Sequence, residues 1–286
     1  TTTAGTFTYN LVSVSVAGGC SQAQTGSAVI TINPLPTATI SGTIDLCQNA
    51  TSPTVLLTGA NGTAPYTFTY NINGGANQTI TSVGNTANIT VSTATIGTFT
   101  YNLVSVQDAS ATGCSQAQTG AATVTVNPLP TATISGTTNL CQNAAAPQIT
   151  FTGANGTAPY TFTYNINGGA NQTVSTIAGN TVTVSASTAT IGTFTYNLVN
   201  VQDASSSACS QAQTGAAIVT INPLPTAVMT GNASVCQNAN SPIITFTGTN
   251  GTAPYTFSYT INGGPTQTIA SAAGNNSVTL SVPTTV

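Results

Sequence analysis

Three segments of this chain recur at a spacing close to 94 residues, and this internal repeat limits the possible folds more than any other feature. The segments are GTFTYNLV, beginning at positions 5, 97 and 192, NPLPTA at 33, 127 and 222, and NGTAPYTF at 61, 155 and 250. A repeat of this length is too long for one solenoid coil or one propeller blade. It matches one immunoglobulin-type β-sandwich of roughly 100 residues. Each repeat is therefore expected to form a domain with its own core.

The NPLP motif marks the expected junctions between repeats. Residues 37–130 and 131–225 are predicted to be complete immunoglobulin-like repeats, 1–36 the C-terminal part of a first repeat, and 226–286 the N-terminal part of a further one. We interpret the chain as a window of a longer array. The alternative is a discrete subunit whose copies complement one another head to tail, by strand addition to an exposed edge.

Two prolines in each NPLP motif restrict the backbone, so the junctions are expected to be stiff linkers rather than turns inside one domain. These linker residues are Pro34, Pro36, Pro128, Pro130, Pro223 and Pro225.

Alternation of apolar and polar residues predicts strands throughout the repeat that begins at Thr131. The expected strands lie at 132–135, 148–152, 160–166, around 174, 182–184, from 192 onward and at 219–221. The apolar parity shifts after Leu198 to Val199 and Val201, which predicts a β-bulge. Asn167-Gly168-Gly169 predicts a tight hairpin turn. The predicted fold class is all-β: a tandem array of immunoglobulin-like β-sandwich domains of about seven strands, extended like beads on a rod.

The near-absence of charge excludes most chemistry. The 286 residues include no Lys, Arg or His, and three carboxylates, Asp45, Asp108 and Asp203. Imidazole bases, phosphate clamps and Schiff-base amines are therefore lacking. We expect no catalysis, no cofactor, no metal site and no nucleic-acid partner. Asp108 and Asp203 are expected in turns rather than at calcium, which takes 6–8 oxygen ligands. No run of roughly 20 apolar residues occurs, so no membrane insertion is expected in this segment.

The six cysteines occupy two equivalent positions of the repeat, and we expect disulfides in an oxidising compartment. They are Cys20, Cys114 and Cys209 before the last strand, and Cys47, Cys141 and Cys236 after the first. The habit of one bridge per immunoglobulin domain favours pairing within a repeat, as Cys47–Cys114 and Cys141–Cys209. The same topology places these loops at opposite ends of a domain, which opposes it. The alternatives are the junction pairs Cys20–Cys47, Cys114–Cys141 and Cys209–Cys236, or a link from one repeat to the next, such as Cys47–Cys209.

Several runs resemble known bacterial repeats. GTAPYTFTYNINGG and GTFTYNLVSVQDASATGCSQAQ resemble the core and the end of SprB-type repeats, and NPLPTATISGT resembles the joints of Ig-like or PKD-like arrays. Tyr70 and Tyr164 stand where that repeat often has Trp. The resemblance covers essentially the whole chain. It implies a giant adhesin on the extracellular surface of gliding Bacteroidota, exported by type IX secretion.

These features favour a structural stalk or filament segment of a repetitive cell-surface protein. Its expected partners are neighbouring repeats, copies of the same fibre, and external surfaces or glycans. The alternatives are a carbohydrate- or surface-binding adhesion module and a head-to-tail strand-complemented fibre subunit. Tyr66, Tyr70 and Tyr101 could stack on sugars, but their alternation with Phe68 and Phe99 favours a place in the core. Ice binding through Thr rows is a further hypothesis.

Overall fold

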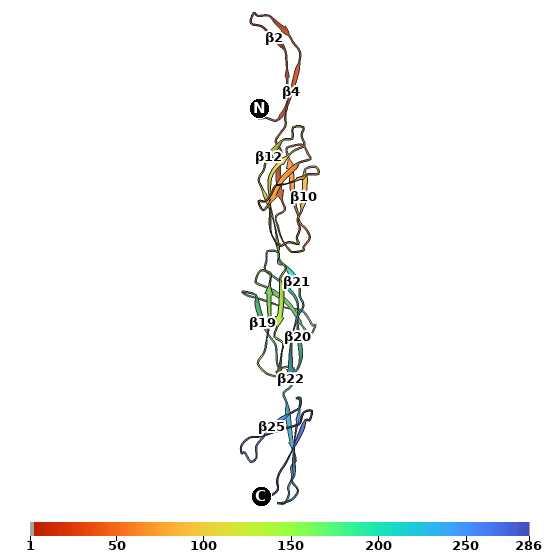
Figure 1. Ribbon diagram of the computed structural model, residues 1–286, viewed down its shortest axis with the longest axis vertical. Coiled ribbons are helices and arrows are strands. Elements are labelled where there is room, and N and C mark those ends of the chain that lie inside the picture. The colour runs from red at the N-terminus through yellow and green to blue at the C-terminus, as the bar shows by residue number, and fades with distance from the viewer. Residues whose placement is uncertain (1–2, 286) are drawn as a thin grey trace. The chain divides into compact units, whose positions relative to one another are not determined.

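The computed structural model describes residues 3–285, and the described chain contains strands and no helix (Figure 1). The all-β prediction is thus confirmed. The chain divides into two compact units. The first comprises Thr1–Pro130 with two loops, Asn155–Thr157 and Asp203–Ser210, and the second comprises Thr131–Ala154, Ala158–Gln202 and Gln211–Val286. The predicted rod-like arrangement of the repeats stays a prediction.

The N-terminal segment forms two antiparallel strand pairs and no sandwich of its own. One pair joins β1 (Gly5–Asn10) to β4 (Ser27–Ile32), and the other joins β2 (Ser13–Ser15) to β3 (Ser21–Ala23). We call residues 5–32 the N-terminal hairpin. Most of its apolar side chains are exposed.

Residues 37–130 form a sandwich of two sheets. One sheet has the order β10-β7-β5; the other has the order β6-β13-β11-β8-β9, and β12 pairs with β11. Pairing is antiparallel except between β6 and β13, which run parallel. The strands are β5 (Thr37–Ser41), β6 (Ile44–Cys47), β7 (Thr54–Ala60), β8 (Thr67–Ile72), β9 (Gln78–Thr81), β10 (Thr86–Thr90), β11 (Gly97–Gln107), β12 (Ser115–Ala117) and β13 (Ala121–Asn127).

Residues 131–225 repeat this topology strand for strand. The sheet orders are β14-β16-β19 and β15-β22-β20-β17-β18, and β21 pairs with β20. The strands are β14 (Thr131–Ser135), β15 (Thr138–Cys141), β16 (Gln148–Ala154), β17 (Thr161–Ile166), β18 (Gln172–Ser175), β19 (Thr181–Ser185), β20 (Gly192–Gln202), β21 (Ser210–Ala212) and β22 (Ala216–Asn222).

The C-terminal segment forms a sheet of three strands and a separate pair. Their orders are β23-β24-β27 and β25-β26. The strands are β23 (Thr226–Thr230), β24 (Ile243–Thr249), β25 (Thr256–Tyr259), β26 (Gln267–Ala270) and β27 (Ser277–Ser281).

Local details of the repeat at 131–225 agree with the alternation pattern in most places. The pairing of β17 with β20 shifts register, so that Asn200 lies opposite Thr163 and Leu198 opposite Tyr164. Val199 is therefore the extra residue, and the predicted bulge is confirmed. The turn is tight, since the N–H of Gly169 donates to the carbonyl of Ile166 over 3.0 Å. The ladder with β18 nevertheless starts further back, at Tyr164 opposite Gln172.

The repeat has nine strands where about seven were expected. The two additional strands are β15 and β21, which are short and lack alternation over more than a few residues. β15 is held by parallel pairing with β22, with Thr138 opposite Val219. This contact joins residues about 80 apart in sequence, and a local pattern contains no signal for it.

Each complete repeat buries its own core between the two sheets. In the repeat at 37–130 the fully buried side chains include Val55, Leu57, Phe68, Val106 and Val124. Their counterparts in the repeat at 131–225 include Ile149, Phe151, Phe162, Val201 and Val219. The alternating positions face inward as expected for a half-buried strand, and their Thr neighbours face outward.

Candidate functional site

The structure joins Cys47 to Cys209, with the two Cα atoms 5.5 Å apart. Cys20, Cys114, Cys141 and Cys236 are free thiols. The favoured pairs within a repeat, Cys47–Cys114 and Cys141–Cys209, are therefore wrong. The junction pairs that include Cys47 or Cys209 are excluded as well. The bond is the third alternative, a link between one repeat and the next.

Strand geometry explains why pairing within a repeat fails. Cys47 is the last residue of β6 and lies opposite Asn127 of β13. The neighbouring β13 residue, Val126, pairs with Gly97, so Cys47 lies level with the start of β11. Cys114 precedes β12, whose first residue pairs with Gln107 at the other end of β11. Ten residue steps at about 3.3 Å separate these ends by about 30 Å. A disulfide requires Cα atoms within about 7 Å.

Hydrogen bonds surround the disulfide and repeat along the first compact unit. The hydroxyl of Ser206 donates to the carboxylate of Asp45 over 2.7 Å, and the amide of Asn127 donates to the hydroxyl of Ser207 over 3.0 Å. The hydrogen bond from Ser206, followed by one from Thr125, holds the pKa of Asp45 below its ordinary value.

The bond between Asn127 and Ser207 has a counterpart one repeat earlier. Asn33, the equivalent of Asn127, donates to the hydroxyl of Thr112 over 2.9 Å. Thr112 is the equivalent of Ser207. The hydrogen bond between the asparagine of the NPLP motif and a hydroxyl of the cysteine loop thus recurs at two successive junctions.

Asp108 and Asp203 organise turns, as the sequence indicated. One oxygen of Asp108 accepts the N–H of Thr63 over 3.0 Å, and the other accepts the hydroxyl of Ser110 over 2.7 Å. Asp203 accepts from Thr157 and Ser205 at the same two distances. Burial raises the pKa of Asp108, but the hydrogen bonds from Ser110 and Thr63 outweigh it and hold the pKa below its ordinary value.

The tyrosines considered for sugar stacking lie in the core. Tyr66, Tyr70 and Tyr101 are 2%, 7% and 5% exposed. The hydroxyl of Tyr66 donates to the carbonyl of Gly62 over 2.9 Å. The same hydroxyl accepts a hydrogen bond from the N–H of Gly62 over 3.1 Å. Burial, and then the neighbouring Tyr70, raise the pKa of Tyr101. These rings are not available to stack on a glycan, and they stabilise the sandwich instead.

The linker prolines differ in their surroundings. Pro36 and Pro130 are buried, and a Cβ added to Gly62 or Gly156 would lie 3.1 or 3.0 Å from their rings. Pro34, Pro223 and Pro225 are exposed, and Pro128 is half-buried. The second proline of a motif thus packs against the glycine turn of the following repeat in the two complete repeats. This packing restricts the linker beyond the effect of the proline ring.

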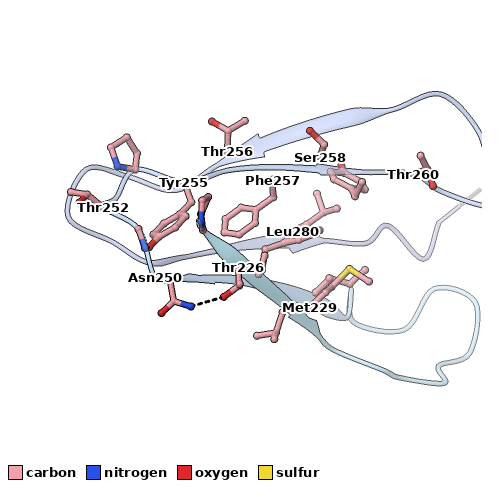
Figure 2. A pocket seen from close by; sticks show the side chains of 18 of the residues that line it. Thr226, Met229, Asn250, Thr252, Tyr255, Thr256, Phe257, Ser258, Thr260 and Leu280 are labelled. Atoms are coloured by element: carbon pink, nitrogen blue, oxygen red, sulfur yellow. Dashed lines mark hydrogen bonds between the residues drawn. The ribbon is translucent and has the colours of Figure 1, made fainter. Parts of the chain in front are cut away.

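The C-terminal segment contains a groove of about 1390 Å³, lined by both apolar and polar side chains. Phe246, Tyr255 and Phe257 form its small core, and the rings of Phe246 and Phe257 lie 5.6 Å apart. Figure 2 shows Met229, Leu280 and Phe257 lining the groove. Phe246, Tyr255 and Phe257 are buried at 5%, 8% and 6% exposure, slightly more exposed than their equivalents Phe151, Tyr160 and Phe162 at 0%, 2% and 0%. No sequence pattern indicates a groove here, since the same residues elsewhere form a closed core.

Neither a metal centre nor a membrane-spanning helix is found in the described range. No three His, Cys, Asp or Glu side chains among residues 3–285 are placed to hold a metal ion. No helix long and apolar enough to cross a membrane is present in the same range.

Comparisons with known proteins agree with the fold. No family model and no curated protein sequence matches the chain. Titin domains I67–I69, a three-Ig structure of an E-to-A variant, share 14% identity with a TM-score of 0.51 over 89% of each chain. This likeness shows that the chain has an immunoglobulin-like fold.

Bacterial adhesin structures are similar at lower TM-scores. The structure of a Ca²⁺-stabilized adhesin that helps an Antarctic bacterium bind ice shares 20% identity, over 98% of this chain and 74% of the chain in that structure, with a TM-score of 0.45. A 1.5-MDa bacterial ice-binding adhesin shares 17% identity over 88% of each chain, with a TM-score of 0.39.

Proposed function

We propose that this chain is a load-bearing structural segment of a long, repetitive bacterial cell-surface protein, without catalysis. The observation that carries the proposal is the Cys47–Cys209 disulfide, which joins two consecutive repeats instead of closing one. The carboxylates and core tyrosines described above are engaged in internal contacts, which supports a structural role.

The disulfide determines which part of the backbone a pulling force reaches. Tension applied to the two ends passes through the bond from Cys47 to Cys209, across a sequence separation of 162 residues. The bypassed segment contains most of the repeats at 37–130 and 131–225. At 3.3–3.6 Å per extended residue, about 550 Å of backbone is withheld from extension. A stalk built in this way keeps its length under load even when a repeat unfolds.

Force spectroscopy on the single chain tests this role. The oxidised chain, pulled from its ends, is expected to reach about 430 Å at full extension, since the bypassed residues do not contribute. With a reducing agent the same chain should reach about 1000 Å. An oxidised chain that extends to about 1000 Å would contradict the load path.

Two variants control this measurement. The double variant Cys47→Ser with Cys209→Ser is expected to extend fully without reductant, because the load path then follows the backbone. Cys114→Ser removes a thiol that is free in the structure and should behave like the unmodified chain.

The same bond supports an extracellular location for the protein. Disulfides persist in oxidising compartments, which favours the extracellular surface. The sequence resemblance to SprB-type repeats extends the proposal to an adhesin exported by type IX secretion, with a role in gliding. Antibodies against the repeats at 37–225 should label intact cells. Labelling only after the cells are permeabilised would refute a surface location.

A further inference from the structure

Each complete repeat turns between two paired strands at an Asn-Gly dipeptide. After β8 the turn is made by Asn73 and Gly74, whose φ angles are +53° and +71°. Asn and Gly adopt this backbone with little strain, and Asn-Gly is the preferred pair in tight hairpins. The turn after β17 repeats the dipeptide as Asn167 and Gly168. Asn is also a chemically labile residue, and a following Gly leaves the backbone nitrogen unshielded by a side chain.

The reaction open to such a dipeptide is deamidation through a cyclic imide. The backbone nitrogen of Gly74 attacks Cγ of Asn73 and forms a new N–Cγ bond. The bond from Cγ to Nδ2 breaks, and the NH₂ group leaves as ammonia with the proton that the Gly74 nitrogen gives up. Water then opens the imide to aspartate or isoaspartate. The change consumes water and releases ammonia, so it needs no other reactant.

The side chain of Asn73 is clamped to β11 at both of its polar atoms. Its Oδ1 accepts the backbone N–H of Thr100 over 2.7 Å, and its Nδ2 donates to the carbonyl of Thr98 over 3.1 Å. The side-chain amide thus continues the ladder between β8 and β11 in the manner of a peptide group. An ionised aspartate could accept from Thr100 but could not donate to Thr98. The clamp therefore requires the labile amide.

The attacking nitrogen is held by a second asparagine. The N–H of Gly74 donates to Oδ1 of Asn71 over 3.1 Å. The same oxygen accepts from Nδ2 of Asn102 on β11, over 3.0 Å. Both partners of the imide reaction, the nitrogen of Gly74 and the amide of Asn73, are therefore engaged elsewhere in the folded turn.

The repeat at 131–225 contains the same network. Oδ1 of Asn165 accepts from the N–H of Gly168 and from Nδ2 of Asn197, both over 3.0 Å. The side chain of Asn167 is clamped to β20 at both polar atoms, over 2.7 and 3.3 Å. Asn73 and Asn167 are both exposed. Burial therefore does not keep water from these turns, and any protection has to come from the hydrogen bonds.

We propose that Asn73 and Asn167 are latent deamidation sites, and that Asn71 and Asn165 protect them by holding the attacking backbone nitrogen. Imide formation needs the two reacting atoms about 3–3.5 Å apart in an aligned geometry. To reach it, the turn has to release both bonds of the clamp and the bond from Gly74 to Asn71. Deamidation then proceeds only from the locally opened hairpin. This inference concerns chemical modification and is independent of the proposed cell-surface function.

The rate of deamidation of the whole chain, folded and unfolded, tests the protection. The chain is incubated at mildly alkaline pH, with and without concentrated urea, and its chymotryptic peptides are followed by mass spectrometry. Three hydrogen bonds to open should make Asn73 react about a hundredfold more slowly in the folded chain than in urea. Rates within about threefold of each other would overturn the proposal.

The low charge of the chain provides a second readout. The formal net charge is −3, and each deamidation adds one negative charge. Isoelectric focusing should therefore resolve the successive products, and their order of appearance should agree with the peptide data.

A matched pair of variants isolates the role of Asn71. Asn71→Ala frees the N–H of Gly74 and is expected to speed deamidation of Asn73 in the folded chain about tenfold. Asn102→Ala removes the neighbouring hydrogen bond to Asn71 but leaves the bond from Gly74 intact, and should speed the reaction by less than about threefold. Equal rates for the two variants would show that general loosening of the hairpin is responsible, and would overturn the role of Asn71.

A conservative variant and the second repeat complete the test. Asn71→Asp keeps the oxygen that accepts from Gly74 and should protect Asn73 as well as the unmodified chain does. Loss of protection in Asn71→Asp would contradict the assigned hydrogen bond. Asn165→Ala should accelerate deamidation of Asn167 and leave Asn73 unchanged. A variant that accelerates both sites equally would refute local protection, and a variant that accelerates neither would refute the role of Asn165.

Discussion

The contact between Gly59 and Tyr66 offers a sharp test of how closely the core is packed. A Cβ on Gly59 would lie 2.5 Å from Cγ of the Tyr66 ring. Carbon atoms normally pack about 3.5–4.0 Å apart, so the ring has to move by about 1 Å. It has little room to do so, because Tyr66 is 2% exposed and its hydroxyl is bound to Gly62 at both donor and acceptor.

Gly59→Ala should therefore destabilise the repeat at 37–130. Overpacking of this kind costs about 1–3 kcal/mol, and Gly→Ala regains about 0.4–1 kcal/mol by restricting the unfolded chain. A net loss of about 1.5 kcal/mol lowers the unfolding temperature of a repeat of this size by roughly 10 °C. Differential scanning calorimetry should show that the transition of the repeat at 37–130 shifts and that the transition of the repeat at 131–225 does not.

Two further variants make the result interpretable. Gly153→Ala creates the same clash with Tyr160, at 2.6 Å, and should shift the transition of the other complete repeat. Gly18→Ala has no atom within 4 Å of the new Cβ and should not lower either transition. An unfolding temperature of Gly59→Ala within about 2 °C of the unmodified chain would refute the close packing of the Tyr66 ring against Gly59.

Three further predictions concern hydrogen bonds and ionisation. Tyr66→Phe leaves the N–H and carbonyl of Gly62 without their partner, and should cost about 1–2 kcal/mol in urea unfolding. Asp108→Asn keeps the shape of the side chain but removes the charge from its hydrogen bonds to Thr63 and Ser110, and should cost about 1–2 kcal/mol in the same assay. Thermal unfolding should be level between about pH 5 and 8, because the chain has no His, Lys or Arg. Below that range the unfolding temperature should fall. The pKa of Asp108 in the folded chain is lower than the ordinary value of 3.8. The stabilisation from the ionised carboxylate is therefore complete above pH 3.8 and is lost as the pH falls through the folded pKa.

Alternation in the sequence was enough to predict the main strands and the inward faces. The shift of parity at Leu198 and Val199 even located the bulge, since a bulge moves every later side chain to the other face. The pairing of β6 with β13 was not predictable in this way, because it is parallel and joins residues 80 apart. Cysteine connectivity depends on that pairing. The pairing of β6 with β13 places Cys47 level with the first residue of β11, whereas Cys114 lies near the last residue of β11.

The role of Asp108 was predictable in kind but not in detail. Its isolation from other carboxylates argued against calcium and for a turn. The donors that bind it come from Thr63, 45 residues away, and from Ser110, two residues away. Only the second of these is visible in the local sequence. The sequence predicted an incomplete repeat at 226–286 but not the groove, whose lining residues show the same alternation as those of a closed core.

The disulfide gives the spacing of the cysteines about NPLP a mechanical meaning. Tension follows the backbone to Cys47, crosses the bond to Cys209 and follows the backbone again from there. The intervals 20–47 and 209–236, each an offset of 27 positions around one NPLP motif, therefore lie on the part of the backbone that carries the load. The interval 114–141 has the same offset but lies in the bypassed segment, so the bond relieves that linker of tension. The two-proline motif restricts the backbone at the loaded positions, which limits how far these linkers lengthen before a repeat unfolds.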